Sequence, residues 1–223
     1  MCKSVADFYH LCELSGKSNN SLYFITILLD SKFTFISLIL MKWKYDIKPN
    51  SDEAVINVFQ SLLRLKALYR QGWLQREVPA EKTESVADHS FGIAMLALLL
   101  CPPELNKLKV LEIALLHETG ECIIGDLTPW DNFTEEEKSR MELDAVEEIL
   151  TQLPDGKRLI SLWKEFEYET SEEGKFVRQL DKLEMGLQAE VYKKLGFDEA
   201  KALIKSAHQK VSDEGLNKYL TKG

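Results

Sequence analysis

From residue 53 onward, apolar residues recur three or four positions apart, which is the period of an α-helix with one apolar face. This pattern continues with few interruptions to about residue 212. The chain is therefore expected to form an all-α domain over residues 51–212, a bundle of about six to seven helices. The first helix is expected over 53–69, where the apolar stripe consists of Val55, Val58, Phe59, Leu62, Leu63 and Leu65.

Capping residues and prolines predict where the later helices begin and end. Thr83 is expected to cap a second helix that stops before Pro102, and a third helix is expected from Leu105 to His117. Thr134 and Glu137 form a capping box for the fourth. The remaining helices are expected near 134–153, 159–166, 176–195 and 198–211, followed by a polar tail at 213–223.

The first fifty residues have a different character and are expected to form an atypical N-terminal extension. Leu22 to Met41 is apolar and of transmembrane length, but Asp30 and Lys32 interrupt it near its centre. Each charge costs about 2.5–3.5 kcal/mol at the middle of a membrane span. Three interpretations stay open for residues 1–50: an extension irrelevant to catalysis, a hairpin of 22–29 with 33–41, or a membrane anchor through 22–41.

Composition places the chain among soluble globular proteins, because 45% of its 223 residues are hydrophobic and 29% are charged. A formal net charge of −8 argues against binding a nucleic acid polymer, which requires a dense basic surface. The four cysteines form no CxxC pair, so we expect reduced thiols in an intracellular, cytoplasmic protein. Cys122, beside two isoleucines, is expected to be buried.

Two of the four histidines stand out because they lie beside carboxylates on otherwise apolar helices. These are His89, which follows Asp88, and His117, which precedes Glu118; Asp181 likewise interrupts an apolar stripe. Buried polar groups are costly unless they are paired or bind a ligand, and a divalent ion would satisfy all of them together. The alternative from the residues alone is a core histidine with solvated surface acids.

Helix geometry restricts how His117 and Glu118 can share one ion. Neighbouring residues in a helix project about 100° apart, so two adjacent ligands can converge only where a helix ends. Gly120 and the Gly125-Asp126 pair that follow are consistent with such an end.

Three separated segments resemble the HD-domain 5′-deoxynucleotidases, and the resemblance covers about residues 53–200. The segments are Glu84 to Ser90, Ala114 to Pro129, and Leu180 to Met185. It implies a helical HD domain whose metal ligands are His89, His117, Glu118 and Asp181, with Glu121 and Asp126 as catalytic acids that position or deprotonate the attacking water.

The resemblance also implies a substrate, a cofactor and an assembly state. Such enzymes remove phosphate from deoxyribonucleoside 5′-monophosphates, usually as homodimers, and use divalent manganese, cobalt or magnesium, with iron and zinc as further candidates. A basic group should hold the phosphate, and Arg70, Trp73 and Arg76 precede the first segment. For these three the alternative is that the arginines are solvated and the tryptophan belongs to the core.

One position departs from the pattern, because Glu118 stands where the family has aspartate. Glutamate keeps the charge but places its carboxylate one methylene further from the backbone. Two other functions therefore stay open: hydrolysis of another phosphoester or pyrophosphate, and a catalytically silent nucleotide-binding relative.

Overall fold

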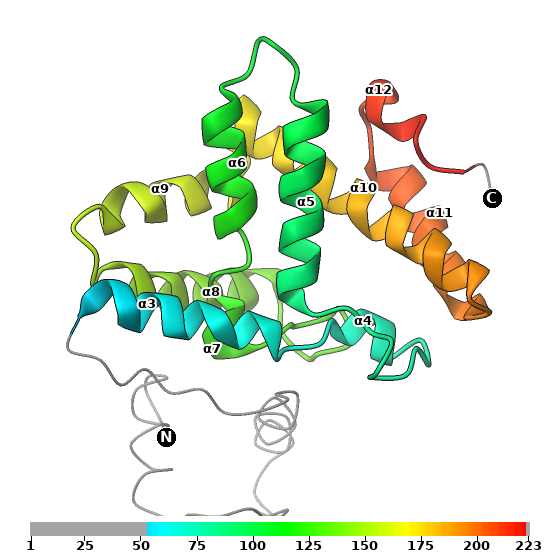
Figure 1. Ribbon diagram of the computed structural model, residues 1–223, viewed down its shortest axis with the longest axis horizontal. Helices are drawn as coiled ribbons and strands as arrows, with labels where there is room; N and C mark the ends of the chain where they lie inside the picture. Colours follow the sequence, from blue (N-terminus) through cyan, green and yellow to red (C-terminus); the bar gives the residue numbers. More distant parts are fainter. Residues whose placement is uncertain (1–52, 222–223) are drawn as a thin grey trace, which may run out of the picture. The chain divides into compact units, whose positions relative to one another are not determined.

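The computed structural model describes residues 53–221, and within this range it is built from helices joined by turns (Figure 1). This confirms the all-α prediction, with seven helices of ten or more residues in the described range. None of the described helices combines the length and the apolar character that crossing a bilayer requires. The predicted extension, including residues 22–41, lies outside the described residues. The long helices are α3 (Ala54–Leu63), α5 (Val86–Leu100), α6 (Lys107–Leu116), α8 (Glu135–Leu150), α9 (Gly156–Glu167), α10 (Glu172–Lys194) and α11 (Lys201–Lys210), and the short ones are α4 (Gln71–Leu74), α7 (Glu121–Ile124) and α12 (Glu214–Asn217).

The first helix ends earlier than predicted, because the chain after it pairs with the segment that precedes α5. After α3 and a 3-10 turn at Arg64–Lys66, Tyr69 forms an isolated antiparallel bridge with Ser85. The Arg70 amide donates to the Glu84 carbonyl at 3.1 Å, and the Val86 amide to the Leu68 carbonyl at 2.9 Å. This pairing fixes Arg70 beside the start of α5.

The prediction that Thr83 caps the second helix is wrong, since Ser85 is the cap of α5. The Ser85 hydroxyl accepts from the Asp88 amide, and the Asp88 carboxylate accepts from the Ser85 amide at 2.9 Å, which completes a capping box. Thr83 instead donates its hydroxyl to the carbonyls of Val78 and Pro79. By contrast, the predicted capping box of Thr134 and Glu137 at the start of α8 is confirmed.

The core forms where α5 and α6, an antiparallel pair, pack against α10 (Figure 1). A second apolar cluster lies between α3, the start of α5, α8 and α9, and includes the buried indole of Trp163. The main cluster contains Ile93, Ala97, Val110, Ile113, Ala114, Leu162, Phe166, Phe176, Val177, Leu180 and Leu183, with Ala207, Val211, Leu216 and Leu220 from the C-terminal part.

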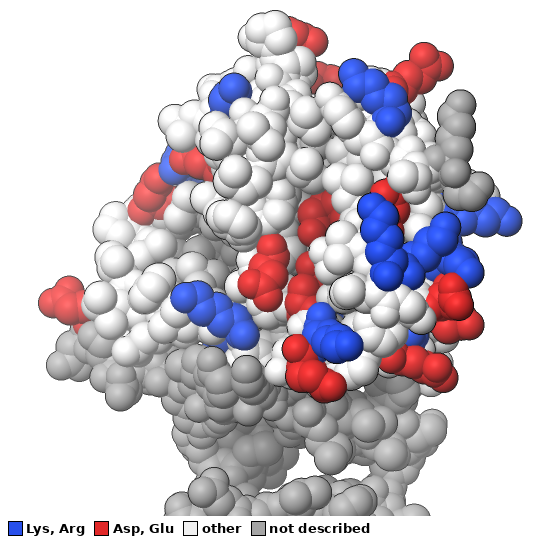
Figure 2. All heavy atoms as spheres, turned by 45° about the vertical axis from the view of Figure 1, so that its right-hand side comes forward, with Lys and Arg blue, Asp and Glu red and all other residues white. Residues whose placement is uncertain are grey.

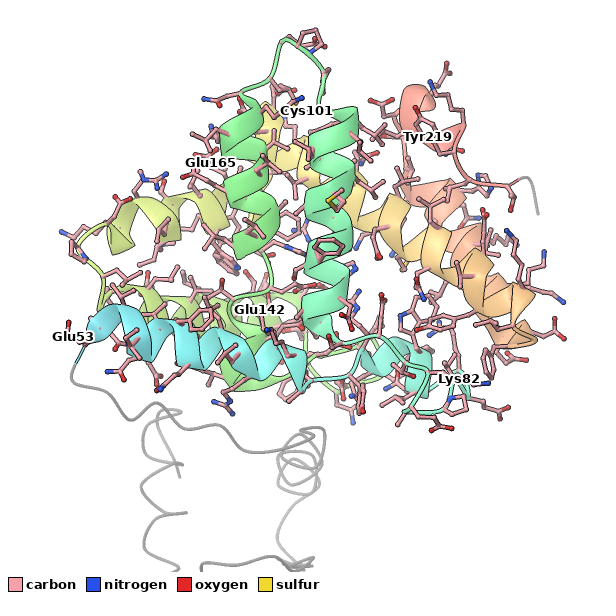
Figure 3. All side chains as sticks on the ribbon, viewed as in Figure 1. Glu53, Lys82, Cys101, Glu142, Glu165 and Tyr219 are labelled. Carbon is pink, nitrogen blue, oxygen red and sulfur yellow. The ribbon has the colours of Figure 1, made fainter. Side chains whose placement is uncertain are left out.

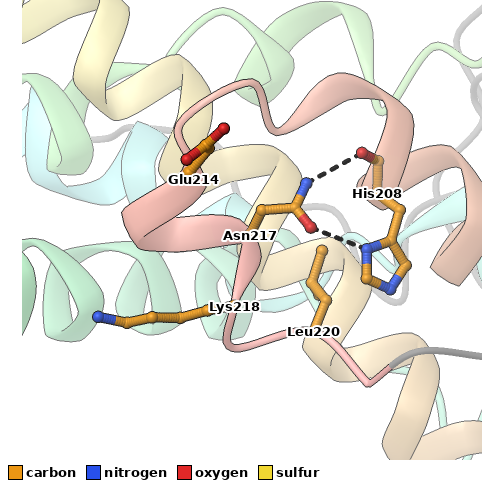
Figure 4. A pocket seen from close by; sticks show the side chains of 5 residues that line it. All are labelled: His208, Glu214, Asn217, Lys218 and Leu220. Atoms are coloured by element: carbon orange, nitrogen blue, oxygen red, sulfur yellow. Dashed lines mark hydrogen bonds between the residues drawn. The ribbon is translucent and has the colours of Figure 1, made fainter.

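The segment that the sequence assigns to a polar tail contains α12 and packs against α10 and α11. Leu216 and Leu220 are buried, and a Cβ on Gly186 of α10 would lie 2.6 Å from both Leu220 and Ala207. Asn217 donates to the His208 carbonyl at 3.0 Å and accepts from the His208 ring at 2.9 Å (Figure 4). Residues 213–221 therefore contribute to the packing of the domain.

Leu220→Ala should lower the free energy of unfolding by about 2–4 kcal/mol, because it removes a buried side chain packed against a glycine and leaves a cavity. Urea unfolding measures this change. Leu195→Ala, at a leucine that is 58% exposed, is the matched control and should change stability by less than about 0.5 kcal/mol. Equal effects of the two substitutions would show that Leu220 adds nothing to the core.

Candidate metal centre

His89 lies in the first turn of α5 and is completely buried. Its Nε2 atom is 3.3 Å from Oδ1 of Asp181 on α10 and 3.6 Å from Oε1 of Glu118. Its Nδ1 atom is 2.6 Å from Oε2 of Glu184, also on α10. The capped start of α5 and the long helix α10 thus bring acids to both edges of one buried imidazole.

His117 is the C-cap residue of α6, so Glu118 follows where the helix has ended. The His117 Nδ1–H donates to the Ala114 carbonyl at 2.8 Å, which turns Nε2 toward Glu118 Oε1 at 3.3 Å. The indole of Trp163 donates to the His117 carbonyl at 3.0 Å, and the Phe166 ring packs edge-on at 5.0 Å. The backbone and the ring of His117 are therefore both held in place.

The four predicted metal ligands lie together. His89, His117 and Glu118 each offer one potential ligand atom, and these three atoms lie within 4.8 Å of one another. Asp181 lies next to His89, with its Oδ1 3.3 Å from Nε2. Both Nε2 atoms are buried and have no hydrogen-bond partner among the described residues. Two unpartnered imidazole nitrogens directed at carboxylates are the donor set of a divalent cation, so the residues fit a metal ion.

Charges around this cluster keep its acids ionised. Burial raises the pKa of Glu118, but His117 and Arg70 outweigh burial and hold the pKa well below its usual range. Burial likewise raises the pKa of Asp181, and Lys182 and His89 hold it well below its usual range. Burial lowers the pKa of His89, whereas Glu184 and Asp181 raise it to about 10. The cluster thus attracts positive charge.

The two predicted catalytic acids follow His117 along the chain, with Glu121 at the start of α7 and Asp126 just after its end. Glu121 begins α7 and is 3% exposed, and its Oε2 has no partner among the described residues. Burial and the charges of Glu118 and Asp126 raise the pKa of Glu121 well above its usual value. Gly120 lets this turn approach α8, because a Cβ there would be 3.0 Å from the carbonyl of Glu142, which is labelled in Figure 3.

Of the three predicted substrate-binding residues, only Arg70 lies beside the candidate metal ligands. Its Nη1 lies 3.2 Å from Glu118 Oε1 and 3.6 Å from Asp126 Oδ1. The next residue, Gln71, donates its backbone amide to the other oxygen of Asp126. The Tyr69–Ser85 bridge therefore positions two groups at the site, the guanidinium of Arg70 and the backbone amide of Gln71.

The other two predicted substrate-binding residues contact different groups. Trp73 is 2% exposed, packs edge-on against Tyr192 and donates its indole N–H to Glu84 at 2.7 Å. Arg76 donates to the Gly72 carbonyl at 2.8 Å, and its guanidinium lies 4.7 Å from the centre of the Trp130 ring. The structure does not bring either of them into the cluster of ligands.

Glu84 and Glu184 are site residues that the sequence analysis missed. Glu184 follows Asp181 by three positions on α10, so both lie on one helix face, and an acid in an apolar stripe is the signal that singled out Asp181. Burial and the charge of Glu184 raise the pKa of Glu84 to about 7. Glu84, His89 and Glu184 form a second group of potential ligand atoms, all within 4.8 Å of one another.

The surface around the domain carries both signs of charge. On the face drawn in Figure 2, acidic side chains occupy the middle, and lysine and arginine side chains lie on either side of them. Two surface hollows of about 440 and 400 Å³ are lined by residues of α10, α11, α12 and the C-terminal segment, including His208 in both. Neither hollow is lined by any of the site residues described above.

The family model for the HD domain matches residues 62–219. The chain belongs to the HD domain family. This HD domain protein is 46% identical to 5′-deoxynucleotidase HDDC2 of Mus musculus over 134 residues, which cover 59% of this chain and 66% of the relative. It is 37% identical to 5′-deoxynucleotidase hdd1 of Schizosaccharomyces pombe over 147 residues, covering 63% and 73%. The family resemblance is thereby confirmed, and the chain spans about two thirds of the length of the curated relatives it matches.

Solved structures show the same HD domain fold. A conserved hypothetical protein from Pyrococcus furiosus superposes with a TM-score of 0.62 at 30% identity, over 74% of this chain and 94% of that one. A predicted metal-dependent phosphohydrolase from Magnetospirillum magnetotacticum superposes with a TM-score of 0.60 at 21% identity, over 75% and 87%. The second likeness concerns the fold alone.

His117→Ala should abolish metal binding, because it removes one of the two imidazole donors and leaves the acids Glu118 and Asp181 to repel each other. The loss of affinity should exceed the about 10–100-fold that changes around ligands typically cause. Calorimetric titration of the purified protein with Mn²⁺ measures it. His208→Ala is the matched control and should bind as tightly as the unsubstituted protein, whereas tight binding by His117→Ala would remove His117 from the site.

Proposed function

We propose that this chain is a metal-dependent 5′-deoxynucleotidase that releases phosphate from deoxyribonucleoside 5′-monophosphates. The observation that carries the proposal is the pair of buried, unpartnered Nε2 atoms of His89 and His117, directed at Glu118 with Arg70 alongside. A metal-binding site with a phosphate-binding group beside it is the arrangement used in metal-assisted phosphomonoester hydrolysis. The 5′-deoxynucleotidase names of the relatives support the choice of substrate.

His89, His117, Glu118 and Asp181 would hold the ion, and manganese, cobalt or magnesium suits this set of imidazole and carboxylate donors. When bound, such an ion supplies a Lewis acid for the phosphate and lowers the pKa of a coordinated water. Glu118 fits this role despite its extra methylene, since its Oε1 lies within 3.6 Å of both Nε2 atoms. Because the Glu118 carboxylate can lie beside both imidazoles, the site supports an enzyme over a catalytically silent nucleotide-binding relative.

Arg70 would bind the phosphate. Its guanidinium is charged at all relevant pH values and presents donors in a planar fork that matches phosphate oxygens. Its Nη1 atom is now close to Glu118 and Asp126, so a phosphate at this position would lie beside the metal ligands and the catalytic acids. Of the three predicted substrate-binding residues, we assign this role to Arg70.

Glu121 and Asp126 would handle the protons of the reaction. The buried Oε2 of Glu121 has no partner in the described range, so it can accept a proton from the attacking water. Asp126 is held by the Gln71 amide and by Arg70, and from there it would orient the water or protonate the leaving 5′ oxygen. Because Arg70 contacts Asp126, the two together would hold the phosphate close to the catalytic acids.

The substrate proposal is tested by measuring phosphate release from dAMP, dGMP, dCMP, dTMP and dUMP with Mn²⁺ or Co²⁺. We expect release from at least one of them, and none after chelation of the metal. A wider panel of phosphoesters and pyrophosphates, assayed in parallel, tests the alternative substrate class. If folded, metal-loaded protein releases phosphate from none of the five nucleotides, this function is excluded.

Glu121→Gln should retain metal affinity and lose about 10²–10⁴-fold in turnover, because the amide keeps the shape but cannot accept the proton. Steady-state kinetics on the best nucleotide, together with Mn²⁺ titration, measures both quantities. Glu190→Gln on α10, a buried acid that accepts from the Thr221 amide at 2.6 Å, is the matched control. Full activity of Glu121→Gln would rule out Glu121 as the base.

A further inference from the structure

The two ring nitrogens of His89 have different partners, and only one of them faces the metal site. Nε2 faces Asp181 and Glu118, whereas Nδ1 lies 2.6 Å from the carboxylate of Glu184. His89 is completely buried and Glu184 is 8% exposed, so Glu184 is the partner of Nδ1. A proton held on Nδ1 leaves the lone pair on Nε2, and the nitrogen that carries the proton is set by its hydrogen bond.

We propose that Glu184 is a positioning residue for the metal centre. Its carboxylate accepts the Nδ1 proton of His89, fixes the ring orientation and presents the Nε2 lone pair to the ion. Hydrogen bonds from carboxylates to metal-binding imidazoles fix the tautomer and raise the basicity of the ligand nitrogen. Glu184 and Asp181 lie three residues apart on α10, so this helix supplies one acid to each edge of the same ring.

Gly92 leaves room for the Glu184 side chain beside His89. It lies on α5 three residues after His89, and a Cβ there would be 2.8 Å from Oε1 and 3.0 Å from Cγ of Glu184. Glycine is disfavoured inside a helix, so its presence here requires a reason. The three atoms nearest to that Cβ all belong to the flexible Glu184 side chain, so an alanine at 92 would displace Glu184 from His89 and leave the backbone in place.

Glu84 lies close to both His89 and Glu184 and is itself held in place. It is held by the indole N–H of Trp73 at 2.7 Å, and its backbone amide donates to the Tyr192 hydroxyl at 2.9 Å. Carboxylate oxygens of Glu84 and Glu184 both lie within 4.8 Å of a His89 nitrogen.

The inference rests on the proposed metal centre, and it is tested by titrating the full chain with Mn²⁺. Glu184→Ala and Gly92→Ala should each weaken binding by about 10–100-fold, the usual effect of losing a hydrogen bond to a ligand. The double variant should bind no more weakly than Glu184→Ala alone, because Gly92→Ala acts by displacing Glu184. Glu190→Ala, at an equally exposed acid of α10, should keep wild-type affinity.

Nitrogen NMR of histidine-labelled full chain loaded with Zn²⁺ gives a readout that a merely structural role would not change. We expect His89 to carry its proton on Nδ1 and to coordinate through Nε2, and Gly92→Ala to weaken the Nδ1 hydrogen bond. Wild-type Mn²⁺ affinity in Gly92→Ala or Glu184→Ala, additive losses in the double variant, or coordination through Nδ1 would each overturn the proposal. The NMR result and Gly92→Ala stand even if Glu184→Ala does not fold.

Failure of the proposed function has a different signature. Wild-type protein that binds Mn²⁺ but releases no phosphate from any nucleotide would exclude the substrate and leave the role of Glu184 intact. Wild-type protein that binds neither Mn²⁺ nor Zn²⁺ would overturn the metal centre, and the role of Glu184 with it.

Discussion

The burial of the His89 imidazole is the constraint on which the rest of the site depends. A polar ring with no exposure to water needs a partner at both nitrogens, because each one left unsatisfied costs free energy. Glu184 on α10 is the partner of Nδ1, whereas Nε2 lies close to Asp181 and Glu118 without a hydrogen bond among the described residues, which is the position that an ion would satisfy. The positions of α5, α6 and α10 are therefore coupled to one side chain as well as to the apolar core they share.

Several of the other candidate site residues lie at helix ends. His117 ends α6, so the chain can turn and direct Glu118 and then Glu121 toward the same region, which a continuous helix would spread around its axis. At the other side, the Tyr69–Ser85 bridge joins the arginine that lies near Glu118 to the cap of α5. Arg70, Glu118, Glu121 and the two imidazoles thus lie at or near helix ends, whereas Asp181 comes from the middle of α10.

The sequence predicts the helices well and the site in part. Periodicity, prolines and the Thr134 capping box locate the elements, since these signals are local. The Tyr69–Ser85 pairing leaves no such signal, because an isolated bridge needs no alternating pattern. Leu216 and Leu220 stand among polar and charged residues, so the local pattern does not predict that they are buried. Their burial depends on contacts with residues far away in the sequence, such as that of Leu220 with Gly186.

Site residues divide in the same way. Polar groups in apolar helices draw attention to His89, His117 and Asp181, but the residues alone leave a metal site and a solvated acidic surface both open, and the full ligand set with Glu118 comes from the family resemblance. The partner of Trp73 cannot be predicted locally, since its indole reaches Glu84 eleven positions further along the chain. The contact between Glu184 and Gly92 depends on how closely α5 approaches α10, which only the packed structure defines.

Anomalous diffraction from crystals of the full chain soaked with Mn²⁺ would locate the ion relative to the two imidazoles. We expect a metal peak at the Nε2 atoms of His89 and His117, with carboxylate oxygens of Glu118 and Asp181 beside it. A peak between Glu84, Glu184 and Nδ1 of His89, or no peak at the Nε2 atoms, would contradict it.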